Sequence, residues 1–357
     1  MLVRWFYDPT LTYEDNYANG PFGAFAGDDA VLAADSPHEV FLGHPVHRPF
    51  GIPAGPLVNA AFCEAAFRQG FDVNVYKTVR TGAYPCHPFP NVLNVHVEGQ
   101  LTLDKAGAPL LADGDLSRAT SISNSFGVPS RDPDVWQPDM AAAVAAAGEG
   151  QLLVGSFQGT HPAPGVADRA AAYVADHVTA ARLAAETGAR VLEVNLSCPN
   201  EGTGNLLCFD TESVVRIAAA IKEEIGDLPL LLKMAYFRDD AALAGFVEAT
   251  RGIVDGYAAI NTIPARLVDA DGAQALPGSG REVAGVCGGA IRWAGLEMVE
   301  RLARLREAGD GFTIVGVGGV LTADDYSALR AAGADAVMSA TGAMIDPALG
   351  AKVRALG

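Results

Sequence analysis

The feature that most constrains the fold is a repeated alternation of short apolar segments with longer alanine-rich segments. Eight short segments are continuous apolar runs, which are typical of strands buried on both faces of a parallel sheet. These runs are residues 51–54, 72–77, 152–157, 190–195, 229–233, 256–260, 313–317 and 335–339. Parallel strands need crossover connections, so helices are expected between them.

The segments between these runs carry helix signals. The predicted helices are residues 170–187, 211–225, 241–250, 296–308 and 322–332. Asp210 or Thr211 is a suitable N-cap with Glu212 in the first turn, and Gly226 stands just past the end of the same helix. Eight strands alternating with helices predict an α/β fold, a (β/α)8 TIM barrel. Periodicity alone leaves a doubly wound open sheet as the alternative.

Two stretches do not fit the alternation. Residues 1–50 are rich in Pro, Gly and aromatic residues, and we interpret them as an N-terminal extension packed on the barrel. Residues 51–357 then form the barrel, with an insertion at about 78–150. The charged, turn-rich piece at 96–116 looks like a small hairpin. No internal repeat or low-complexity linker divides the chain, so one domain is predicted.

Charge and composition exclude several classes of function. The 42 acidic and 25 basic residues give a net charge of −17, which repels nucleic acids and anionic membrane surfaces. No apolar run reaches the ~18–20 residues of a membrane-spanning helix, and no signal peptide is visible. Five widely spaced cysteines without a CxxC pair argue against a disulfide framework, a zinc site or an iron–sulfur centre. We expect a cytoplasmic protein with no metal site.

Functional side chains of a barrel lie at the carboxyl ends of its strands. Lys77 and Lys233 end apolar strands, and burying an ammonium group without a partner is costly, so both are predicted to be functional. The glycine-rich turn 316–319 suits a phosphate, whose oxygens accept backbone N–H bonds, but it also suits a tight strand-to-helix turn.

Cys198 lies in a polar loop, residues 195–200, directly after a strand. A cysteine there is a candidate base or nucleophile, whereas most unpaired cysteines are inert buried thiols. A nucleophile needs a histidine partner, and no histidine can be placed at a strand end. Three asparagines, Asn195, Asn200 and Asn261, fall at the same rim, and each amide side chain offers both hydrogen-bond donors and an acceptor.

These residues carry a resemblance to a known family. Asn-Leu-Ser-Cys-Pro-Asn at 195–200 resembles the catalytic loop of the dihydroorotate dehydrogenase family. Further segments are similar to that family in the same order, from about residue 50 to 345: 51–55 with Asn59, 124–129, 285–299, 315–320 and 339–342. Phe126 stands where the family usually has methionine, and Ala340 where it usually has glycine.

The resemblance implies an FMN-dependent barrel that oxidises dihydroorotate to orotate. Cys198 would take the proton from C5 while a hydride leaves C6 for flavin N5. Lys77 would contact flavin and the substrate carboxylate, and Lys233 would stabilise negative charge near flavin N1. The implied cofactor-binding residues are Ala54, Gly55, Lys77, Thr78, Asn195, Lys233, Gly288, Gly318, Gly319, Ala340 and Thr341.

The resemblance also implies how the substrate is held. Asn124 and the backbone N–H groups of Phe126, Gly127 and Val128 would cradle the carboxylate. The ring would be bound by Asn195, Asn200, Asn261 and Thr262. The family further suggests a homodimer. Fumarate, oxygen, or NAD through an iron–sulfur partner subunit all stay open as electron acceptor.

Other functions stay open beside this one. The nearest is oxidation or reduction of a related dihydropyrimidine or a specialised-metabolite ring, although a carboxylate cradle at Asn124 favours orotate. A flavin-free barrel acting on a phosphorylated metabolite would share the phosphate turns but would not need Cys198. A non-catalytic scaffold is disfavoured by the two lysines at the rim.

Overall fold

Eight parallel strands form the centre of the computed structural model, which describes residues 5–31, 36–197, 206–307 and 311–356. In chain order they are β3 (Phe50–Gly51), β4 (Val73–Val75), β8 (Leu152–Phe157), β9 (Val191–Asn195), β10 (Leu230–Met234), β11 (Gly256–Ala259), β14 (Thr313–Val317) and β15 (Ala336–Met338). From β4 to β15 each strand pairs in parallel with the next in this order, and β15 pairs in parallel with β3. Backbone hydrogen bonds from Asp72 to Phe50 (2.8 Å) and from Val75 to Ile52 (2.9 Å) join β4 to β3. The predicted TIM barrel is therefore confirmed, and the open-sheet alternative is wrong.

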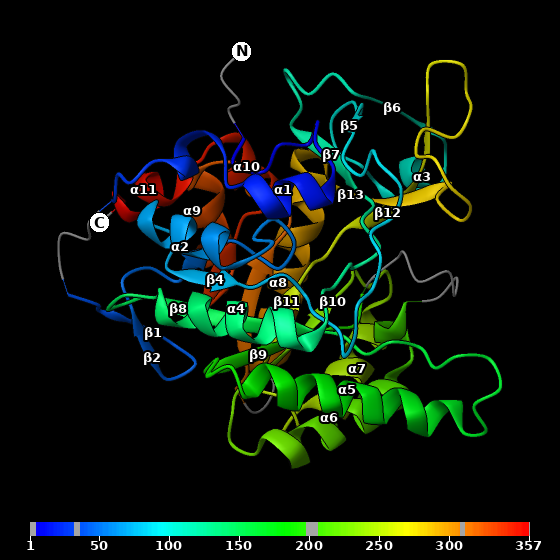
Figure 1. Ribbon diagram of the computed structural model, residues 1–357. Coiled ribbons are helices and arrows are strands. Elements are labelled where there is room, and N and C mark those ends of the chain that lie inside the picture. Colours follow the sequence, from blue (N-terminus) through cyan, green and yellow to red (C-terminus); the bar gives the residue numbers. More distant parts are fainter. Residues whose placement is uncertain (1–4, 32–35, 198–205, 308–310, 357) are drawn as a thin grey trace.

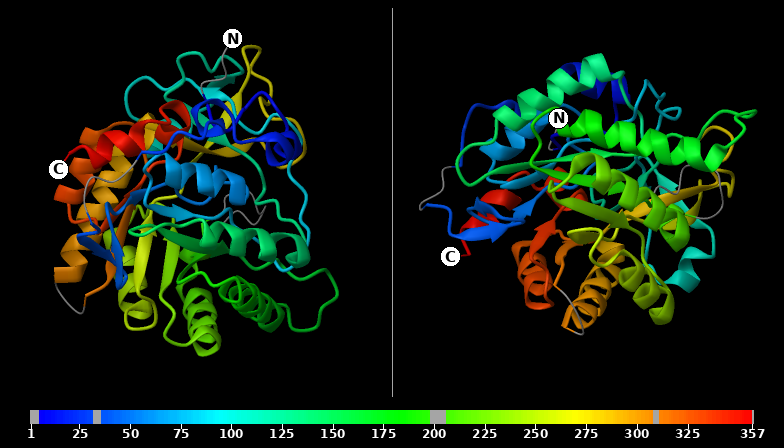
Figure 2. Two further views of the ribbon diagram at one scale, coloured as in Figure 1. Left: turned by 60° about the vertical axis from the view of Figure 1, so that its left-hand side comes forward. Right: turned by 90° about the horizontal axis from the view of Figure 1, so that it is seen from below.

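Helices surround the strands on the outside, as Figures 1 and 2 show. They are α2 (Ala60–Arg68), α4 (Pro133–Ala145), α5 (Arg169–Ala185), α6 (Thr211–Ile225), α7 (Asp240–Thr250), α8 (Arg292–Glu307), α9 (Ala323–Ala331), α10 (Thr341–Ile345) and α11 (Leu349–Arg354). Asp210 is the N-cap of α6 and accepts a hydrogen bond from the Ser213 amide (3.1 Å). Helix α8 begins earlier than the predicted residue 296. Gly295 lies inside the helix, and close packing explains the glycine there. A Cβ at this position would lie 2.6 Å from the Gly318 carbonyl oxygen.

The first strand is shorter than predicted. Ile52 donates its amide hydrogen to the Asn74 side chain (3.1 Å) instead of a neighbouring strand, and Pro53 has no amide hydrogen to donate. The ladder therefore ends at Gly51.

Inward-facing side chains of the barrel form an apolar layer at one end. Its members are Val73, Val75, Leu152, Val154, Val191, Leu231, Ala258, Val315, Val317, Ala336 and Met338. The hairpin of β1 (Glu39–Phe41) and β2 (His44–Val46) packs Phe41 and Val46 against this layer. Side chains alternate along a strand with a period of two, so the next inward positions lie one layer higher. The side chains at these next inward positions are polar, and they are Lys77, Ser156, Glu193 and Lys233.

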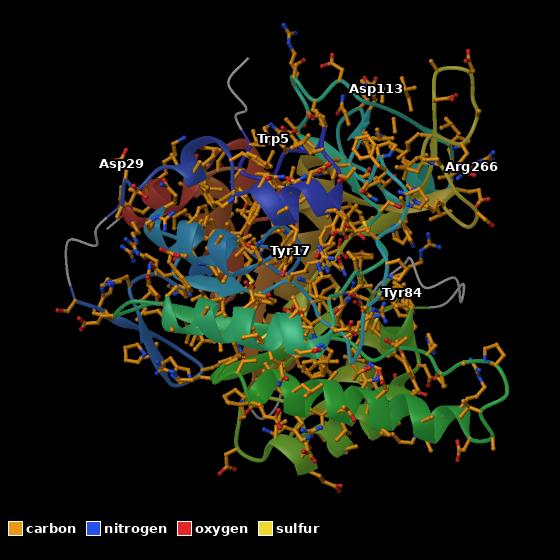
Figure 3. The ribbon with its side chains drawn as sticks, in the orientation of Figure 1. Trp5, Tyr17, Asp29, Tyr84, Asp113 and Arg266 are labelled. Carbon is orange, nitrogen blue, oxygen red and sulfur yellow. The ribbon has the colours of Figure 1, made fainter. Side chains whose placement is uncertain are left out.

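A second, smaller sheet lies at the other end of the barrel, beside the N-terminal helix α1 (Tyr13–Asn19) in Figure 1. Its strands are β5 (Asn94–Val95), β6 (Leu110–Asp113), β7 (Ser121–Asn124), β12 (Ile263–Val268) and β13 (Val283–Gly288), and they pair in a closed ring. The predicted hairpin at 96–116 corresponds to the antiparallel pair β5–β6, with the short helix α3 (Leu103–Ala106) between its strands. β12 was not predicted, because it alternates buried and exposed residues and is therefore not a continuous apolar run. Arg266, labelled in Figure 3, is on its exposed side.

Aromatic residues attach the N-terminal segment to the barrel. The rings of Phe6 and Phe25 stack at 4.2 Å, and Phe6 also meets Phe62 of α2 edge-on at 6.3 Å. Trp5 and Tyr17, labelled in Figure 3, belong to the same segment. In the part of the chain that the structure describes, no helix has the length and apolar character needed to cross a membrane.

A buried ion pair joins the last helix to the barrel. Asp72, which is 0% exposed, binds Arg354 of α11 through both carboxylate oxygens, with 3.1 Å between Nε and Oδ2. Asp72 also accepts hydrogen bonds from Gln151 (3.2 Å) and from the Arg48 amide (3.2 Å). Burial raises the pKa of Asp72, and the Arg354 charge opposes that rise.

We predict that Arg354→Met lowers the free energy of unfolding by about 3–5 kcal/mol at pH 8, because it leaves a buried carboxylate unpaired. Losing Arg354 raises the pKa of Asp72 further. A carboxyl whose folded pKa is raised destabilises the protein above its unfolded pKa, and protonation relieves this effect as the pH falls. Urea unfolding should therefore show a smaller loss at pH 5 than at pH 8. Lys352→Met, on an exposed face of α11, is the control and should change stability by less than about 1 kcal/mol. An equal loss at both pH values would contradict the prediction.

Candidate active site

A cavity of about 1060 Å³, its open mouth included, lies between the carboxyl ends of the barrel strands and the small sheet. The barrel contributes residues from the ends of most strands, among them Lys77, Asn195 and Lys233. The small sheet contributes Asn124 and Cys287, and the N-terminal segment contributes a residue that the sequence did not single out, Tyr7. Three separate parts of the chain therefore build one site.

Fourteen of the residues singled out from the sequence line this cavity. They are Ala54, Gly55, Lys77, Thr78, Asn124, Phe126, Gly127, Val128, Asn195, Lys233, Asn261, Thr262, Ala340 and Thr341. Cys198 and Asn200 lie outside the described residues. Their roles therefore stay predictions from the sequence.

Three of the predicted cofactor glycines do not line the cavity. Gly318 follows the lining residue Val317, and Gly288 follows the lining residue Cys287. A Cβ at Gly319 would lie 2.3 Å from the Arg292 Cα, and one at Gly288 would lie 2.2 Å from the Thr120 carbonyl oxygen. Close backbone packing explains both glycines, and their contact with a phosphate stays a prediction.

The floor of the cavity carries buried charges. Glu193 is 0% exposed, and Lys233 is 5% exposed on the adjacent strand. Burial raises the pKa of Glu193, while the Lys233 charge and a hydrogen bond from Ser156 (3.4 Å) lower it. Its second oxygen, Oε2, has no hydrogen-bond partner among the described residues. Glu193 was not predicted, although its position two residues before Asn195 places both side chains on the same face of β9.

Lys77 connects the barrel to the loop that follows β7. Its Nζ lies 3.2 Å from the Thr78 carbonyl oxygen and 3.5 Å from that of Pro129. The side chain is 7% exposed and faces the cavity. This places a positive charge beside residues 124–128.

The backbone of residues 126–128 has its amide hydrogens available. The carbonyl of Phe126 accepts a hydrogen bond from the His87 amide (3.0 Å), and that of Val128 accepts one from Arg80 Nε (3.0 Å). In contrast, the amide groups of Phe126, Gly127 and Val128 donate to no described residue. Gly127 and Val128 both have positive φ, +78° and +53°, a conformation rare for valine. Backbone donors without acceptors beside a lysine are suited to an anion.

The amide side chains at the strand ends are held by neighbours. Asn195 donates to Gln158 Oε1 (2.8 Å), and its own oxygen accepts a hydrogen bond from the Ser197 amide (3.3 Å). Asn261 donates to the carbonyl and the hydroxyl of Ser197, both at 3.1 Å. Asn195 and Asn261 are thus fixed relative to one another through one residue. The hydroxyl oxygen of Thr262 is buried and has no partner among the described residues.

Comparisons with known proteins agree with this architecture. Residues 118–354 match the family model described as dihydroorotate dehydrogenase. The chain is 33% identical to a dihydroorotate dehydrogenase of Dictyostelium discoideum over 359 aligned positions, covering 97% of this chain and 95% of that protein. It is also similar to the catalytic subunit of dihydroorotate dehydrogenase B (NAD(+)) of Maridesulfovibrio salexigens, 29% identical over 46% of this chain and 52% of that subunit.

A solved structure shares the fold. The dihydroorotate dehydrogenase of Eimeria tenella, in complex with ferulenol, superposes with a TM-score of 0.68 at 18% identity, over 88% of this chain and 81% of that one. The fold is that of a TIM barrel with a cavity at the carboxyl ends of its strands. The chain belongs to the dihydroorotate dehydrogenase family, and it is an oxidoreductase that acts on a CH–CH bond.

The conformation of Gly127 gives a prediction about stability. A Cβ at this position would lie 2.5 Å from the His87 ring, in addition to the positive φ. Gly127→Ala should therefore lower the free energy of unfolding by the ~1–2 kcal/mol that a left-handed conformation costs alanine, and further by the cost of displacing the His87 ring. Gly165→Ala is the control, because φ there is +96° but nothing lies within 4 Å of the added Cβ. Thermal unfolding should show a larger loss of stability for Gly127→Ala than for Gly165→Ala. Equal losses of stability would show that packing against His87 does not constrain the loop.

Proposed function

We propose that this protein oxidises dihydroorotate to orotate with bound FMN. The observation that carries the proposal is the loop of residues 126–128, whose three backbone donors have no described acceptor and lie beside Lys77. A carboxylate on the ring of the substrate would accept these hydrogen bonds. The similarity to the Dictyostelium discoideum enzyme, which spans nearly the whole chain, supports the same substrate.

The residues of the cavity fit a flavin. Gly55 lines the cavity with φ of +141°, and a Cβ there would meet no atom within 4 Å, so the space beside its backbone is open to a flat ring. Ala340 and Thr341 line the cavity at the end of the last strand, a common phosphate site in barrels. Lys233, opposed by the buried Glu193, would lie under the ring where negative charge develops. When bound, FMN would supply the acceptor for the hydride that leaves C6.

The remaining steps belong to the residues of this chain. Lys77 and the 126–128 amides would hold the carboxylate, and Asn195, Asn261 and Thr262 would hold the ring by its N–H and C=O groups. The motif at 195–200 supports Cys198 as the base that takes the C5 proton, and Asn200 as a further ring contact. A free thiol with pKa near ~8.5 is close enough to neutral pH to serve as a base.

Spectroscopy of the purified protein tests both cofactor and substrate. Heat should release FMN, identified by chromatography, and dihydroorotate should bleach the bound flavin without oxygen. Orotate should shift the flavin spectrum while uracil at equal concentration does little, because a site built for a charged group rejects a ligand that leaves its donors unpaired. Equal or tighter binding of uracil would favour the related-ring alternative. Release of FAD, or no flavin after supplementation with FMN, would contradict the cofactor assignment.

A variant at Cys198 tests the base. Cys198→Ser should keep FMN and orotate binding, because those contacts come from other residues. It should slow flavin reduction by dihydroorotate by roughly 10²–10⁴-fold near neutral pH, as expected for loss of a positioned base. The residual rate should rise at higher pH than in the parent, since serine gives up its proton less readily. Stopped-flow absorbance measures this rate, and reduction at the parental rate would exclude Cys198 as the base.

A further inference from the structure

The N-terminal segment brings one side chain into the cavity. Tyr7 is 3% exposed and lines the cavity together with Phe126, the first residue of the loop whose amide groups donate to no described residue. The two rings meet edge-on, with 5.8 Å between centroids and 84° between planes. A residue more than a hundred positions before the loop therefore forms the wall next to it.

The position of Tyr7 is fixed by its neighbours along the chain. The next residue, Asp8, donates its amide hydrogen to Asn16 Oδ1 (2.7 Å), and Asn16 Nδ2 donates back to the Asp8 carbonyl (2.8 Å). Asn16 is fully buried in α1. On the preceding side, the Phe6 carbonyl accepts a hydrogen bond from the Phe22 amide (2.8 Å). Tyr7 is thus held rigidly between two anchored residues.

Contacts of α1 also fix the segment relative to the loop. Glu14 forms an ion pair with Arg131, and the Arg131 guanidinium lies 4.5 Å from the centroid of the Tyr17 ring. Arg131 follows the loop by three residues. The geometry between Tyr7 and residues 126–128 therefore does not depend on the Phe126 contact alone.

The Tyr7 side chain is almost wholly buried and lines the cavity, and its hydroxyl makes no hydrogen bond to a described residue. A hydroxyl beside the cavity without a partner among the described residues is available to donate to a ligand there. Burial, followed by Cys86, Tyr13 and Asp8, raises the pKa of Tyr7 above its usual value, so the phenol stays protonated and able to donate.

We propose that Tyr7 is a substrate-binding residue, and that it donates its hydroxyl hydrogen to the carboxylate held by Lys77 and the 126–128 amides. This inference rests on the proposed function, because it names a further contact of the same ligand. The phenol would then form part of the wall of the carboxylate pocket, next to Phe126. The N-terminal extension then contributes to the selection of a carboxylate-bearing ring.

Tyr7→Phe tests the contact, because it removes one oxygen and keeps the ring packing against Phe126. The holoenzyme should bind orotate roughly 10-fold or more weakly by flavin absorbance and by calorimetry, the expected loss for one hydrogen bond to a charged group. Affinity for uracil should stay unchanged, so the preference for orotate over uracil narrows. Flavin content and melting temperature should match the parent.

Tyr13→Phe is the matched control. Tyr13 is buried on the same segment and its ring also meets Phe126 edge-on, at 6.3 Å, but it does not line the cavity. Its variant should bind orotate as the parent does. If Tyr7→Phe and Tyr13→Phe weaken orotate binding equally, or if Tyr7→Phe also weakens uracil equally, Tyr7 acts only through packing and the inference is wrong.

The same titrations separate this inference from the proposed function. A parent protein that does not bind orotate would overturn the proposed function itself. A parent that binds orotate and a Tyr7→Phe variant that binds it equally well would overturn only the role of Tyr7.

Discussion

The register of the inward-facing side chains on β8, β9 and β10 is the constraint on which the site depends. Ser156 is paired with Glu193 across β8 and β9, and Asn195 with Lys233 across β9 and β10. A shift of one residue would turn Glu193 and Lys233 toward the outer helices, because side chains alternate between faces. Two buried charges are tolerated only where they compensate each other. The register of the strands therefore fixes both the apolar layer of the barrel and the polar layer above it.

The polar layer becomes a site because other segments cover it. A bare barrel mouth would expose Lys77 and the asparagines to water, where a hydrogen bond to a ligand gains little over one to solvent. The small sheet and the N-terminal segment contribute Asn124 and Tyr7 to the lining of the cavity at this mouth. Lower local polarity strengthens each charge-assisted hydrogen bond made there. The additions to the barrel are thus part of the site.

The strands of the barrel and many site residues follow from the sequence, because buried parallel strands are continuous apolar runs and functional groups stand where those runs end. Lys77 and Lys233 were found in this way. β12 was missed because one of its faces is exposed, which gives an alternating pattern. Glu193 was missed because it lies inside an apolar run. Tyr7 left no local signal, since its position depends on contacts with residues distant in the sequence.

The acidity of the protein is compatible with an anionic substrate, because the net surface charge and the charges inside the cavity act over different distances. At physiological salt, a net charge of −17 spread over the surface is screened within about 8 Å. That field still disfavours a polyanion, which must cover many surface charges at once. Within the cavity, the Lys233 charge is partly compensated by Glu193, whereas Lys77 lies beside a loop whose three amide groups donate to no described residue. The local potential at residues 126–128 is therefore positive, and a single carboxylate can bind there although the surrounding surface repels larger anions.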